Sequence, residues 1–200
     1  MKSAHLLFLL AGLFGATFLA RSDDNPTLTG ATKVQLAFLG GYDTDPRDHG
    51  RPVVLVAAAL GVPPQVFRDA FSHVHPAPAG EQPTQDEVHD NKRQLLSRLA
   101  PYGVTNERLD EVSNYYRYRP ESGQLWRHVE AEGYAIVGPA DTVIRVVITN
   151  PGSGYTTPPN IDVGGTLNFG SSFTASLSFG TDLNKNGSIS SIKAAPRPAS

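Results

Sequence analysis

The chain of 200 residues contains no cysteine, and this absence excludes several kinds of site. Without thiols there is no disulfide, no thiolate zinc site, no cysteine nucleophile and no lipoprotein thioether. Charge of one sign is also lacking, because the formal net charge is only -2 at pH 7. Such a balance provides no electrostatic attraction for nucleic acid or for an anionic membrane surface, so we expect neither as a partner.

The sequence also lacks the short motifs of common catalytic sites. It contains no nucleophile elbow, no G-x-G-x-x-G fingerprint, no P-loop and no H-E-x-x-H pair. Serine, histidine and aspartate side chains assembled from distant positions would leave no such spacing signal. We therefore assign no catalytic residue from the sequence.

Only one long hydrophobic run is present, over residues 6–20. It follows Lys2 and precedes an Ala20-Arg21-Ser22 segment with small residues at the spacing of a cleavage site, which is the layout of a secretory signal peptide. The run is short for a membrane span, which needs about 20 residues. A retained anchor helix is the alternative interpretation. We expect a secreted, periplasmic or cell-surface protein with no membrane span after signal cleavage.

Hydrophobic periodicity changes once along the rest of the chain, which predicts an α+β protein: an N-terminal small helical bundle followed by a small antiparallel β module. The expected organisation is a signal peptide (1–22), a linker or entry loop (23–47), a helical region (48–128), a β module (134–194) and a disordered tail (195–200). Residues 34–39 of the entry loop could form a short strand.

Four helices are expected in the helical region. Residues 53–60 are apolar on all sides, which predicts a buried helix, although the β-branched start also permits a buried strand. Pro63-Pro64 opens the second helix, Thr84 and Glu87 form a capping box for the third, and Thr105 caps the fourth.

The β module follows a two-residue period. The expected strands are 134–137, 143–149, 160–163, 173–179 and 188–193. Asn186-Gly187 before the last strand predicts a tight hairpin turn.

Three segments carry resemblances to known proteins. Residues 150–159 (NPGSGYTTPP) resemble a GSGY-T-x-P-P β-repeat of exported bacterial, adhesin-like and phage tail proteins. Residues 40–71 and 101–120 are similar to a family of uncharacterised secreted bacterial proteins. The resemblance implies export and the pairing of a helical part with a structural or adhesive β module. It implies no catalytic residue.

The segment after residue 181 resembles the first half of a calcium loop. Its candidate ligands are Asp182, Asn184 and Asn186, with glycine at the sixth position. Lys193, however, stands at the twelfth position, where such loops carry a bidentate carboxylate. The alternative is the plain Asn-Gly turn. We expect no cofactor, with weak calcium binding here as the one exception.

An acidic cluster occupies the start of the helical region. Its four potential metal ligands are Asp43, Asp45, Asp48 and His49. Such residues can hold calcium or zinc, or act as an acid–base pair. Arg47 and Arg51 lie among them and could neutralise the carboxylates, and Asp48 could cap the helix that Pro52 opens. The structural alternative is therefore a turn and a helix cap.

The richest aromatic and basic cluster lies at the end of the helical region. Its members are Tyr115, Tyr116, Arg117, Tyr118, Arg119 and Trp126. Exposed aromatic rings stack on sugars, and arginine adds hydrogen bonds; the same set could hold a peptide or anchor the fourth helix against the β module.

These observations predict a secreted non-enzymatic binding or surface-associated structural protein, with envelope polysaccharide or another surface protein as partner. An exported hydrolase or metal-dependent enzyme that uses the acidic cluster is the alternative.

Overall fold

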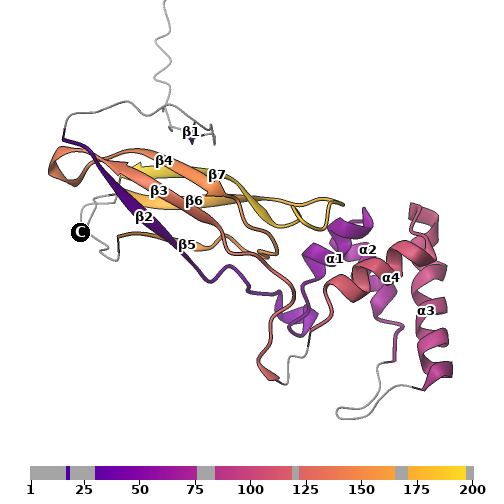
Figure 1. Cartoon of the computed structure of the whole chain (residues 1–200). Coiled ribbons are helices and arrows are strands. Elements are labelled where there is room, and N and C mark those ends of the chain that lie inside the picture. Colours follow the sequence, from indigo (N-terminus) through magenta and orange to yellow (C-terminus); the bar gives the residue numbers. More distant parts are fainter. Residues whose placement is uncertain (1–16, 19–29, 76–83, 119–121, 165–170, 197–200) are drawn as a thin grey trace, which may run out of the picture.

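The computed structural model describes residues 17–18, 30–75, 84–118, 122–164 and 171–196 (Figure 1). Over these ranges the chain has helices and two antiparallel sheets, which confirms the α+β class. The predicted signal peptide lies outside the described residues apart from Thr17–Phe18, and so does Arg119 of the aromatic cluster.

Two sheets pack against one another, and the helices gather at one end of them (Figure 1). The four-stranded sheet has the order β4-β3-β2-β5, with β2 Thr32–Leu39, β3 Glu132–Val137, β4 Val143–Asn150 and β5 Asn160–Val163. The three-stranded sheet has the order β1-β7-β6, with β1 Thr17–Phe18, β6 Ser171–Ser178 and β7 Ser188–Pro196. Leu36 and Val146 of the first sheet share a core with Ile189 and Ile192 of the second.

Strand β2 connects the segment before the helices to the β module. It begins at Thr32, two residues before the expected strand, and pairs with both β3 and β5. Leu36 and Phe38 alternate with exposed neighbours, so one face of β2 lies in the sandwich core. The helices are thus inserted between two neighbouring strands of one sheet, and residues 32–39 belong to the β module, not to a linker. At the other end, β7 includes two residues of the expected tail.

The four expected helices are present: α1 Val53–Leu60, α2 Pro64–Phe71, α3 Gln85–Leu99 and α4 Asn106–Tyr115. The capping box of Thr84 and Glu87 is confirmed, as is the Thr105 cap, which accepts from the Arg108 amide. Residues 53–60 form a helix, with Leu55, Ala57 and Ala59 fully buried. Gly61 ends it in the left-handed conformation at φ 71°, which glycine adopts without a Cβ penalty.

The described helices were compared with the length and hydropathy that a membrane span requires. Among the described residues no single helix has the length and apolar character of a span, and α1 with α2 passes only as a pair that bends by 104° at the break between them.

The Asn186-Gly187 turn is present directly before β7, because the Ser188 amide donates to Lys185 O at 3.1 Å and Gly187 has a φ of +70°. It is not the tight hairpin that was expected. The loop between β6 and β7 covers residues 179–187, and Asn186 is only 1% exposed. Its Nδ2 donates to Leu55 O at 2.7 Å and to Tyr116 Oη at 2.9 Å, while its Oδ1 accepts from the Gly180 amide. Because turn propensity describes only local sequence, it could not reveal an amide that joins the loop to α1 and α4.

Candidate functional site

The loop from β2 to α1 passes beside α2 and α4, and three adjoining hollows surround it. Their volumes are about 360, 310 and 220 Å³. All three are lined by Arg51 and Val53. This junction contains most of the residues that the sequence singled out.

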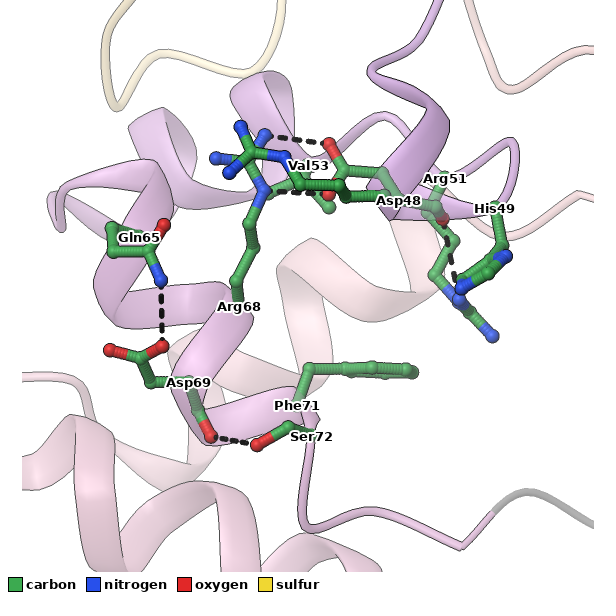
Figure 2. Close-up of a pocket in the computed structure, with 10 residues that line it drawn as sticks. Asp48, His49, Arg51, Val53, Gln65, Arg68, Asp69, Phe71 and Ser72 are labelled. Carbon is green, nitrogen blue, oxygen red and sulfur yellow. Dashed lines mark hydrogen bonds and ion pairs between the residues drawn. The ribbon is translucent and has the colours of Figure 1, made fainter.

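Asp48 is the buried member of the acidic cluster. Its side chain is 3% exposed, and its two oxygens accept from Arg68 Nε at 2.6 Å and Arg68 Nη2 at 2.8 Å (Figure 2). The N-cap of α1 is Pro52, which makes no side-chain cap, so the prediction that Asp48 caps this helix is wrong. Asp48 instead ties the loop to α2, because a paired charge can be buried where an isolated one cannot.

Asp45 is also neutralised. Arg47 donates to it through the side chain, with Nη2 at 2.6 Å from Oδ2, and through the backbone amide, while Arg68 Nη2 lies 3.6 Å away. The hydrogen bond from the Arg47 side chain is the main reason that the pKa of Asp45 lies well below its usual range. A general acid needs a raised pKa, so this environment opposes that role.

Asp43 and His49 do not join the two paired carboxylates. Asp43 is exposed and accepts from Thr157 Oγ1 at 3.4 Å, and His49 is exposed in the left-handed region at φ 50°. Within the described ranges no group of three or more His, Asp or Glu side chains is arranged to hold a metal ion. The metal role of the acidic cluster stays a prediction; the contacts favour the alternative of a turn held by arginines.

The candidate calcium ligands are held by contacts of their own. Asp182 accepts from the Asn184 amide at 3.0 Å and lies 3.5 Å from Lys185 Nζ. Asn184 Oδ1 lies 3.5 Å from the Tyr115 hydroxyl, and the Asn186 amide is buried as described above. Calcium binding by this loop also stays a prediction.

Two members of the aromatic cluster are packing residues. Trp126 is 2% exposed, and its Nε1 donates to Gly154 O at 2.8 Å. Tyr116 is buried, its hydroxyl accepts from Asn186, and burial raises its pKa to about 12. These rings join α4 to the β part, as the structural alternative expected. The Arg127 guanidinium lies over the Tyr115 ring, with its central carbon 4.8 Å from the ring centroid.

The remaining members face a hollow of about 310 Å³, which we call the Arg51 groove. Its lining includes Arg51, Val56, Phe67, Phe71, Arg117 and Tyr118. Val56, Phe71 and Tyr118 are half-buried, so apolar surface remains accessible there. Tyr118 is held by a 2.6 Å bond to Gly50 O and by an edge contact with Trp126.

Arg51 and Arg117 differ from the other arginines of the junction. The Arg51 guanidinium lies 4.6 Å from the Phe71 ring centroid, and its Nη1 donates to Asp48 O at 3.3 Å (Figure 2). Arg117 donates to the amide oxygen of Asn114 at 2.9 Å. Neither forms an ion pair with a carboxylate of the described part of the chain.

Sequence reasoning missed the contribution of α2 to this groove. Phe67 and Phe71 are four residues apart and therefore share a helix face, but that spacing signals a core as readily as a groove. Arg51 was expected only as a neutraliser of the acidic cluster. Nothing in the local sequence indicates that Arg68 would take that place.

None of the protein-family models, curated proteins or solved structures compared with the chain matches it. The resemblance to secreted bacterial proteins with a β-repeat stays a prediction.

Proposed function

We propose that this chain is an exported, non-enzymatic binding protein that acts at or beyond the cell envelope and recognises its ligand in the Arg51 groove. The observation that supports this most is the gathering of Arg117 and Tyr118 in one accessible hollow with Arg51 and two phenylalanines of α2, to which the buried Tyr116 contributes part of the wall. Binding pockets in proteins are concave and mostly apolar, with a few polar groups that fix orientation.

The contacts of the acidic cluster support binding over catalysis. An exported hydrolase using these residues would need a carboxyl group free to exchange protons or a free carboxylate. Asp45 and Asp48 are instead paired with Arg47 and Arg68, and the exposed Asp43 does not join them in one site.

Export is supported by the N-terminal hydrophobic run and the acidic residues that follow it. The β-sandwich would then serve as the rigid support, because the loop that enters α1 continues directly from β2 and is held by Thr156 and Thr157, whose amides donate to Gly41 O. Ligand-contacting loops on a rigid scaffold are a common arrangement.

The test begins with protein recovered from culture medium and envelope fractions of an expressing bacterium. Intact-mass analysis should give a chain shortened by the signal peptide, and native mass spectrometry should show a retained small molecule or one captured from envelope extract. Arg51→Gln should lose that species. Arg93→Gln should keep it, because Arg93 is an exposed α3 residue paired with Asp90 and does not line the groove.

Two results would overturn the proposal. One is cytosolic protein that still begins at Met1 as the only form. The other is turnover of a sugar, ester or peptide that Asp45→Asn or Asp48→Asn abolishes while the fold is retained.

A further inference from the structure

We infer that the ligand of the Arg51 groove is a small amphiphilic anion, in which one carboxylate or phosphate group is attached to an apolar body. This inference rests on the proposed binding function and names the chemical class of the ligand.

The charge of the groove favours an anionic ligand. The described lining contains two arginines and no aspartate or glutamate. The other arginines of the junction, Arg47 and Arg68, are neutralised because each pairs with a carboxylate. Arg51 and Arg117 therefore carry positive charge into the groove without an ion pair to a described carboxylate, and an anion would balance it.

The geometry of Arg51 suits a carboxylate or phosphate group. A guanidinium has five N–H donors in a fixed fork, which suits a carboxylate or a phosphate. Contact with the Phe71 ring and one long bond to Asp48 O orient this fork and engage few of its donors. A preoriented arginine loses less side-chain entropy when a ligand binds.

The apolar lining favours a ligand with an apolar body. Val53, Val56, Phe67 and Phe71 line the hollow next to the two arginines. The Tyr116 and Tyr118 hydroxyls, which could bind sugar hydroxyls, already bond to Asn186 and to Gly50 O. A neutral sugar would therefore find few free polar partners, whereas an apolar body would cover the aliphatic and aromatic surface.

The volume limits the size of this ligand. About 310 Å³ lies at the lower end of small-molecule sites. The groove suits a short acyl or aryl acid better than a long lipid or a folded partner.

Calorimetric titration of the whole mature chain with four matched probes tests the inference. The probes are octanoate, octanol, octylammonium and acetate, all as monomers. Octanoate should bind, octanol should bind roughly ten-fold or more weakly, and octylammonium and acetate should give no measurable heat, because each lacks the required charge or the apolar body. Octyl phosphate, titrated next, distinguishes a phosphate source from a carboxylate source.

Two variants locate the site. Arg51→Gln should weaken octanoate binding by roughly ten- to a hundred-fold, the usual effect of losing a charge-assisted hydrogen bond. Arg117→Gln should weaken it less, since that residue is exposed, and it keeps the test available if the first variant folds poorly. Arg93→Gln removes the same charge from α3 and should leave the affinity unchanged.

The outcomes separate this inference from the binding function. Equal binding of octanol and octanoate, or octanoate binding that Arg51→Gln and Arg117→Gln leave intact, overturns the amphiphilic-anion assignment while the groove can still bind. A neutral envelope ligand lost in Arg51→Gln does the same. Absence of any groove ligand, from the probes and from envelope extract, overturns both.

Discussion

Arg68 and Arg51 line the same junction but differ in what surrounds them. Arg68 is largely buried and makes two short bonds to a buried carboxylate, with a second carboxylate at 3.6 Å. Arg51 lies over a phenylalanine ring and makes one long bond to a carbonyl. The buried Asp48 carboxylate is therefore paired by an arginine that lies 20 residues later in the sequence, and Arg51 is left to face the groove.

The largest loss of stability should come from replacing Arg68, the arginine that is paired with carboxylates. Arg68→Gln leaves the buried Asp48 carboxylate without its partner, and we expect a loss of about 3–5 kcal/mol in the free energy of unfolding. Arg51→Gln removes only a ring contact and a long hydrogen bond, so it should cost under about 1 kcal/mol. Urea unfolding of both variants measures the difference; equal losses would contradict the comparison.

The next effect concerns the 179–187 loop, which packs against Leu55 of α1 and against Tyr155. An alanine Cβ at Gly187 would lie 2.4 Å from Tyr155 O and 2.7 Å from a Leu55 methyl group, at a φ of +70°. We expect Gly187→Ala to destabilise the protein by about 2–4 kcal/mol through overpacking and backbone strain.

Gly103→Ala is the matched control for that variant. Its φ is +85°, but no atom lies within 4 Å of the added Cβ, so only the left-handed conformation is penalised, by about 1–2 kcal/mol. If both alanine variants lost the same stability, the close packing of the 179–187 loop against α1 would be incorrect.

A smaller effect should appear at alkaline pH. Burial raises the folded-state pKa of Tyr116 to about 12, whereas the unfolded chain releases this proton near pH 10. The folded state therefore binds more protons between these values, and stability should fall as pH rises from about 10 to about 12, by roughly 1–3 kcal/mol in total.

Tyr116→Phe is the variant that assigns this slope. It should be less stable near neutral pH, because the Asn186 amide loses an acceptor, and should show a shallower decline above pH 10. Tyr42, whose pKa is also raised by burial, will keep part of the slope. A decline of the same steepness in the variant would rule out Tyr116 as a source.

The smallest effect is expected from calcium. Asp182 and Asn186 already take part in contacts of the 179–187 loop, so millimolar calcium should raise the thermal midpoint by less than about 1 °C. A calcium-dependent rise of several degrees that a chelator reverses, and that Asp182→Asn removes, would show that the calcium-loop prediction was right.

Local signals predicted much of the fold. The two caps at Thr84 and Thr105 and the helix over residues 53–60 follow from neighbouring residues, and each is present. The inner position of β2 could not be predicted, because it depends on pairing with β5, whose register joins Leu36 to Val163 across the whole helical insertion.

The candidate site was predictable only in part. Tyr116, Arg117 and Tyr118 were named from local composition and do line the groove. The other side of the groove comes from α2, and the partner of Asp48 comes from the same helix, at a separation that no local pattern reports. Which of several arginines a carboxylate binds is decided by tertiary packing.

The most direct measurement follows the side-chain Nε–Hε signals of Arg51 and Arg68 in one NMR titration with octanoate. We expect a progressive, saturable shift of the Arg51 signal and a nearly constant Arg68 signal, because the Arg68 guanidinium is already held by Asp48. A shift of the Arg68 signal alone, or no shift of either signal at saturating octanoate, would contradict the assignment of Arg51 as the ligand-binding group.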